Sequence, residues 1–133
     1  RALVPAFSEW FLSGGEIAYD AAGEQTIVFS DGLVTAYHAT SDRWETLYET
    51  DPAMPDEWTA GTARVGHWMV YDPVNERLVV YGGWARRLND WVQVEADDVL
   101  AFDPATRTWT VLLEPSEPHD GGAAGRLTPP AIP

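Results

Sequence analysis

The chain contains no cysteine and no lysine, and each absence excludes a class of function. Without cysteine there is no disulfide, no thiolate metal site and no thiol nucleophile. All eight basic residues are arginines, and against 21 acidic residues they leave a formal net charge of −13. An electrostatic field of that sign repels phosphate groups, so nucleic acids and anionic membrane surfaces are poor partners for this chain.

Long apolar segments and the usual catalytic motifs are also missing. No apolar run approaches the roughly 20 residues of a membrane-spanning helix, and no secretory signal pattern opens the sequence. There is no nucleophile elbow, phosphate loop or dinucleotide fingerprint. His38, His67 and His119 lack metal-ligand spacing, and the acidic residues of 90–98 lack a calcium-loop pattern. We therefore predict no catalytic residue, metal site, cofactor or membrane insertion, and the sequence favours no cellular compartment.

Aromatic and turn-forming residues, in contrast, are abundant. The 133 residues include seven Trp, five Tyr and four Phe, together with 11 Gly and ten Pro. Aromatic and β-branched residues favour strands, while Gly and Pro favour turns. The 45% of apolar residues is enough for a globular core. The composition predicts one all-β domain.

The stretch 64–113 contains four short apolar runs separated by turn residues, and the preceding part of the chain repeats their order. Tyr19 and Phe29 correspond to Tyr71 and Tyr81 with an offset of 52 positions. Tyr37 and Trp44 correspond to Phe102 and Trp109 with an offset of 65. The two offsets differ by 13 residues, which we interpret as an insertion within 84–97 of the second copy.

The second copy resembles the kelch repeat of β-propellers. The resemblance rests on Arg64 with Gly66-His67, Tyr81-Gly82-Gly83, Phe102-Asp103-Pro104 and Trp109. The first copy is degenerate, because Ser30-Asp31 replaces the Gly pair and His38-Ala39 replaces Asp-Pro. The resemblance implies an all-β fold of two kelch-like four-stranded antiparallel blades from an incomplete β-propeller.

We expect five segments along the chain. They are an N-terminal segment that could be a strand of a preceding blade (1–13), a first, degenerate blade (14–48), an inter-blade loop (49–63), a second blade (64–113) and a Pro- and Gly-rich tail or start of a third blade (114–133). Two blades cannot close a ring, since propellers have about four to eight. The chain is then a fragment of a longer propeller, or several copies complete one, or another chain supplies blades.

Individual residues carry structural expectations. We expect Trp109 to pack on the neighbouring blade, Tyr71 and Tyr81 to fill the space between blades, and Trp68 to be packed within its blade. We expect positive φ at Gly82 and in the turn at Gly23, where a residue without a side chain is tolerated.

The long connections of an antiparallel meander lie at one end, and they carry the candidate binding residues. These are Trp58, Trp84, Arg86, Arg87, Asn89 and Trp91. Trp and Arg are enriched in binding hot spots, and long loops on a rigid scaffold often bind. The alternative is structural: a loop Trp can fold over the sheet, and the Arg pair can bind the acidic residues of 90–98.

The resulting hypothesis is a non-enzymatic protein-binding or assembly module that recognises a partner through the long-loop face. The partner is a protein or further propeller blades, on the same or another chain, and the module is an acidic oligomer or fragment. The alternative is part of a larger propeller enzyme or carbohydrate-binding protein whose site lies outside this chain, in which loop Trp residues stack on sugar rings.

Overall fold

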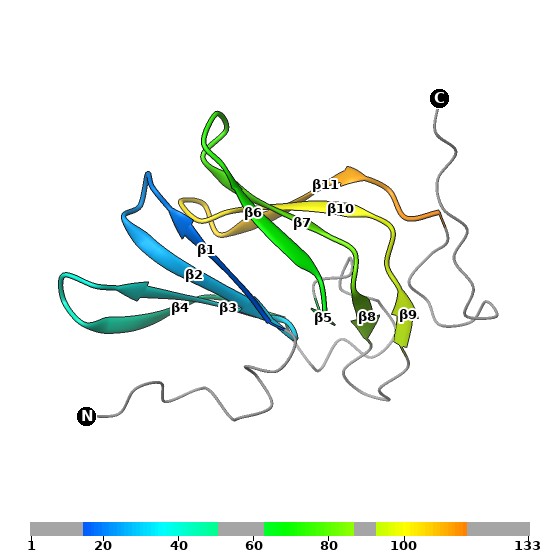
Figure 1. Ribbon diagram of the computed structural model, residues 1–133, viewed down its shortest axis with the longest axis horizontal. Coiled ribbons are helices and arrows are strands. Elements are labelled where there is room, and N and C mark those ends of the chain that lie inside the picture. Colours follow the sequence, from blue (N-terminus) through cyan, green and yellow to red (C-terminus); the bar gives the residue numbers. More distant parts are fainter. Residues whose placement is uncertain (1–14, 51–62, 87–92, 117–133) are drawn as a thin grey trace.

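The computed structural model describes residues 15–50, 63–86 and 93–116, and these consist only of strands and their connections (Figure 1). The prediction of an all-β fold is confirmed. The strands are β1 (Glu16–Asp20), β2 (Gln25–Ser30), β3 (Leu33–His38), β4 (Arg43–Glu49), β5 (Arg64–Val65), β6 (Trp68–Asp72), β7 (Arg77–Tyr81), β8 (Trp84–Arg86), β9 (Gln93–Glu95), β10 (Val99–Asp103) and β11 (Thr108–Leu113).

The strands form two four-stranded antiparallel sheets, as the sequence predicted, and one smaller sheet. The N-terminal sheet has the order β1-β2-β3-β4, and the C-terminal sheet has the order β6-β7-β10-β11. The small sheet, β5-β8-β9, lies at the other end of the molecule from the hairpin turns (Figure 1). The first strands of the two large sheets, β1 and β6, lie side by side.

The two large sheets have the same strand register. Tyr19 pairs with Thr26 as Tyr71 pairs with Leu78, which reproduces the offset of 52. The third and fourth strands reproduce the offset of 65, and a register shift occurs at Val34/Thr35 in one sheet and at Val99/Leu100 in the other. The segment between β7 and β10 forms the β8–β9 hairpin. The sequence repeat is therefore a repeat of backbone geometry.

Four of the hairpin turns have the same feature at their last residue. Each ends in a non-glycine residue with positive φ, namely Glu24, Asp42, Glu76 and Arg107. In three of these turns the preceding strand ends in an Asp whose Oδ1 accepts a backbone N–H: that of Gly23 at 3.0 Å, Val74 at 3.1 Å or Ala105 at 2.9 Å. These bonds satisfy turn donors that would otherwise depend on water.

Glycine at position 23 is required for space. The prediction of positive φ at Gly23 is wrong, because the positive φ of 50° belongs to Glu24. A Cβ on Gly23 would lie 2.5 Å from Asp20 Oδ2. The carboxylate that supports the turn therefore leaves no room for a side chain.

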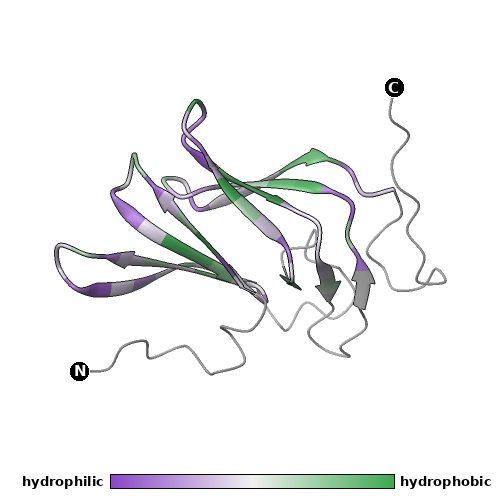
Figure 2. Cartoon of the chain, viewed as in Figure 1, coloured by the Kyte–Doolittle hydropathy of each residue, from purple (hydrophilic) through white to green (hydrophobic). Residues whose placement is uncertain are grey.

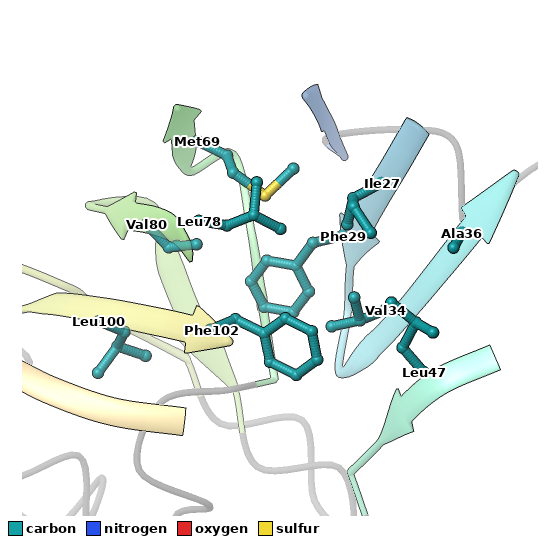
Figure 3. Packing of buried hydrophobic residues seen from close by; sticks show 10 residues of the cluster. All are labelled: Ile27, Phe29, Val34, Ala36, Leu47, Met69, Leu78, Val80, Leu100 and Phe102. Atoms are coloured by element: carbon teal, nitrogen blue, oxygen red, sulfur yellow. The ribbon is translucent and has the colours of Figure 1, made fainter. Parts of the chain in front are cut away.

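The core lies between the two large sheets (Figure 3). The N-terminal sheet contributes Ile27, Phe29, Val34, Ala36 and Leu47, and the C-terminal sheet contributes Met69, Leu78, Val80, Leu100 and Phe102. We call the side of each sheet that carries these residues its contact face and the opposite side its outer face. Burying each large apolar side chain stabilises the fold by about 1.5–3 kcal/mol, so the packing of one sheet on the other is the main stabilising contact.

Trp109, on the edge strand β11, completes this core, as the sequence predicted. Its ring lies 5.0 Å from Phe29 and 5.0 Å from Phe102, measured between ring centroids. Tyr48 from β4 approaches it edge-on at 6.0 Å. Tilted and edge-on aromatic pairs add to the stabilisation from burial alone. Trp109 therefore holds the outer strands of the two sheets together.

Two expectations about aromatic residues are wrong. Trp68 is 70% exposed and Tyr81 is 51% exposed, although both were expected to be packed. Their neighbours Met69 and Val80 point into the core, and successive side chains of a strand point to opposite faces. Trp68 and Tyr81 therefore lie on the outer face of the C-terminal sheet. Tyr71, in contrast, packs against the core as expected.

The paired positions of Trp109 and Trp44 give a matched stability test. Trp109→Ala should lower the free energy of unfolding by about 3 kcal/mol, because it removes a ring packed between two sheets. Trp44→Ala should cost less, because Trp44 stacks on Tyr37 on an outer face and is not packed between the two large sheets. Urea unfolding measures both, and equal losses would contradict this account of the core.

Candidate functional site

A buried arginine joins the three sheets. The side chain of Arg64 is fully buried, and its Nη2 lies 2.9 Å from Asp98 Oδ2. Its Nη1 donates to the carbonyl of Gly82 at 3.1 Å, and its own carbonyl accepts the N–H of Asp31 at 2.8 Å. A buried guanidinium without such partners would be very costly. Arg64 therefore fixes the ends of β7 and β10 and the β2–β3 turn relative to the small sheet.

The glycine pair after β7 makes this arrangement possible. Gly82 and Gly83 have φ values of 72° and 86°, so the predicted positive φ at Gly82 is confirmed. A Cβ on Gly83 would lie 2.5 Å from the carbonyl oxygen of Val65 and 2.7 Å from the nitrogen of His67. The nearest atom to a Cβ on Gly82 is 4.0 Å away. Gly83 thus allows close backbone approach, whereas Gly82 is needed for its conformation alone.

Alanine substitutions should separate these two effects. Gly82→Ala should cost about 1–2 kcal/mol, the strain of a left-handed residue with a side chain. Gly83→Ala adds overlap with the backbone of β5 and should cost about 3 kcal/mol or more. Thermal and urea unfolding of the two variants measure the difference. A larger loss for Gly82→Ala would show that the close approach at Gly83 is wrong.

His67 lies beneath this network in a fully buried position. Its ring centroid is 4.5 Å from that of Phe29. Burial lowers the pKa of His67 from 6.5 to about 4, and the charge of nearby Arg64 acts in the same direction, while a backbone hydrogen bond to Phe29 opposes both. The folded protein therefore holds His67 in its neutral form at neutral pH.

This lowered pKa predicts a pH-dependent stability. Below pH 6.5 the unfolded chain takes up a proton at His67 and the folded chain does not, so stability should fall between pH 6.5 and about 4. The total loss from this residue should be about 3 kcal/mol. Urea midpoints across this range measure it. His67→Gln should flatten the dependence, and an unchanged slope in this variant would contradict the assignment.

The small sheet contains two of the six binding residues predicted from the sequence. Trp84 begins β8 and is 48% exposed, and Arg86 ends β8, where its backbone pairs with Gln93. Trp58, Arg87, Asn89 and Trp91 lie outside the described residues. Trp84 is therefore a half-exposed side chain on the small sheet, which the Arg64–Asp98 pair joins to the C-terminal sheet.

The outer face of the C-terminal sheet is an apolar surface that the sequence reasoning missed. Trp68, Val70 and Tyr81 are 70%, 60% and 51% exposed, and Leu112 and Leu113 from β11 are also exposed. Figure 2 shows the apolar stretches that run along β6, β10 and β11. Scattered apolar residues are common on surfaces, but a contiguous set on one sheet is a candidate interaction surface. The repeat offset of 52 could have indicated this apolar face. Val70 is the counterpart of Ala18, which packs against the core in the first copy.

The outer face of the N-terminal sheet is less apolar. Ile17 and Tyr19 are 62% and 56% exposed. Tyr37 and Trp44 are half-buried and their rings lie 5.1 Å apart. At its centre Thr35 is buried. This face therefore presents an aromatic and apolar rim.

A pocket of about 300 Å³ lies at the opposite end, among the hairpin turns. It is lined by Asp20, Ala22, Gly23, Gln25, Asn75, Glu76, Asp103, Pro104 and Ala105. The carboxylate of Asp20 accepts hydrogen bonds from Gly23 N and Gln25 Nε2, and that of Asp103 accepts from its own turn. The carboxylates of Asp20 and Asp103 therefore already accept hydrogen bonds within the structure of the turns.

The described residues contain neither a cluster of metal ligands nor a membrane-spanning helix. Within residues 15–50, 63–86 and 93–116, no group of three or more His, Asp or Glu side chains could hold a metal ion. The same residues include no helix long and apolar enough to cross a membrane.

Comparison with known proteins adds no further assignment. No protein-family model matches the chain, and no curated protein shows significant similarity to it.

Proposed function

We propose that this chain is a non-enzymatic protein-binding or assembly module built from kelch-like blades. One observation carries the proposal: the outer face of the C-terminal sheet exposes Trp68, Val70 and Tyr81 on a four-stranded antiparallel sheet. Large aromatic residues on such a surface are typical of binding hot spots. A protein surface, which can cover several strands at once, matches this flat apolar face.

The blade interpretation is supported by where the kelch-like residues lie. Gly82 and Gly83 follow the second strand of the C-terminal sheet, and Asp103 ends its third strand. Trp109 packs on the neighbouring sheet. In a propeller each sheet is covered by its neighbours on both faces. An uncovered apolar outer face is what a blade without its next neighbour would have.

The long-connection end is a second region of the proposed module. Trp84 is half-exposed there, and the β8–β9 hairpin that carries it rests on the buried Arg64–Asp98 pair. Of the predicted binding residues, Trp84 and Arg86 lie in β8, whereas Trp58, Arg87, Asn89 and Trp91 belong to the proposal by sequence alone. The alternative function, part of a larger propeller enzyme or carbohydrate-binding protein, would use Trp84 as a stacking surface for a sugar ring.

The two surfaces can be tested separately with the full chain, tagged and expressed in the cells that naturally make it. Trp68→Asp should reduce the recovered partner at least about tenfold, since a central aromatic contact is lost. Trp84→Asp is the matched control for the other end. Circular dichroism confirms that each exposed-site variant is folded. If recovery is unchanged in both variants, the module does not bind proteins through either surface; oligosaccharide binding that depends on Trp84 would favour the alternative.

A further inference from the structure

We infer that the partner of the C-terminal outer face is a second copy of this chain, which docks the outer face of its own N-terminal sheet there, head to tail. The inference rests on the proposed assembly function and names the partner. Every copy has both outer faces, so one contact leaves one face of each type available for another copy.

The contact between the two large sheets within one chain is the model for the proposed contact between copies. By the shared register, Val70, Val79 and Tyr81 are the counterparts of Ala18, Ile27 and Phe29. Leu112 and Leu113 are likewise the counterparts of Leu47 and Tyr48. In the N-terminal sheet these positions form the core or pack directly against it. In the C-terminal sheet the same positions carry apolar residues, of which Val79 is half-buried and the other four are exposed. The C-terminal outer face is therefore built like a surface that already packs on a sheet.

The N-terminal outer face of a second copy resembles the surface on which the N-terminal sheet packs within one chain. Within one chain, the N-terminal contact face packs on the side of the C-terminal sheet that carries Met69, Tyr71, Phe102 and Trp109. The counterparts of these residues on the N-terminal outer face are Ile17, Tyr19, Tyr37 and Trp44. The three aromatic positions are all retained. Head-to-tail docking would repeat the rim of the internal contact between copies, because Val28 and Thr35 at the centre of the N-terminal outer face are buried.

The differences between the faces set the strength of the contact. Thr26, Thr35 and Thr46 stand where the C-terminal contact face has Leu78, Leu100 and Val111. Threonine at these positions gives the N-terminal outer face less apolar area to bury. The centre of this face is already buried, so the exposed side chains of Ile17 and Tyr19 at its rim are the ones left for docking. We therefore expect a reversible association that is weaker than the contact within the chain.

Charge does not oppose this docking locally. Inside the chain, Arg107 Nη2 lies 3.4 Å from Glu45 Oε1 across the two sheets. The counterparts at the proposed contact are Asp42 and Thr110, which bring no like charges together. The net charge of −13 on each copy does repel, so salt should strengthen the association.

A contact between unlike faces gives rings or filaments, whereas a contact of one face with itself gives a closed dimer. Each copy supplies two four-stranded sheets. If four to eight sheets close a propeller, a ring contains about two to four copies.

Variants that are each altered on one of the two outer faces provide the test. Trp68→Asp places a charge on the C-terminal outer face, and Tyr19→Asp places a charge on the N-terminal outer face, so each should block docking through that face. Val74→Asp is the control, because Val74 is an exposed turn residue that lies on neither face. Light scattering at physiological salt should give a multiple of 14.7 kDa for the wild type and for Val74→Asp. Each of the other two variants alone should be a monomer. Their equimolar mixture should form a one-to-one dimer, because one intact face of each type remains.

Other outcomes would overturn the inference. If Tyr19→Asp still dimerises while Trp68→Asp does not, the C-terminal outer face binds itself. If the wild type stays a monomer at all concentrations and salts, the partner is another molecule; the proposed binding function then survives only if a foreign protein is recovered in a Trp68-dependent manner. Val70→Asp and Ile17→Asp replace either variant if circular dichroism shows that it is unfolded.

Discussion

The buried pair of Arg64 and Asp98 is the interaction on which the other contacts depend. A guanidinium with no exposed surface is tolerated only when its donors are satisfied, and Asp98 and the Gly82 carbonyl do this at 2.9 and 3.1 Å. These partners are 34 and 18 residues away in sequence. The pair therefore holds the start of β5 and the start of β10 against the end of β7, where the glycine pair allows the close backbone approach.

Packing between the two large sheets follows from this placement. Once β1 and β6 lie side by side, alternation sends one set of side chains from each sheet into the shared core and the other set outward. Phe29, Phe102 and Trp109 then meet at the centre of the contact. The two outer faces are a consequence of the same alternation, since each strand that fills the core must also present its other side.

The sequence predicted most of what depends on local order. Turn residues and apolar runs predicted both large sheets, and repeat offsets predicted their common register. Trp109 could be placed because its position recurs in both copies. The exposure of Trp68 and Tyr81 could not, since alternation gives two faces but does not say which one a neighbour covers. The partner of Asp98 was also missed, because pairing over 34 residues leaves no periodic signal. Of the predicted binding set, the structure describes the exposure of Trp84 alone.

The meander order of the sheets has a consequence for folding kinetics. In the N-terminal sheet every strand pairs with its immediate neighbours in sequence, so each pairing closes a loop of only a few residues. The C-terminal sheet departs from this at one point, where β7 must find β10 across the β8–β9 hairpin. Chains rich in local pairings cross their folding barrier faster than chains that depend on distant ones. The N-terminal sheet can therefore form first and serve as the surface on which the slower sheet completes its pairing.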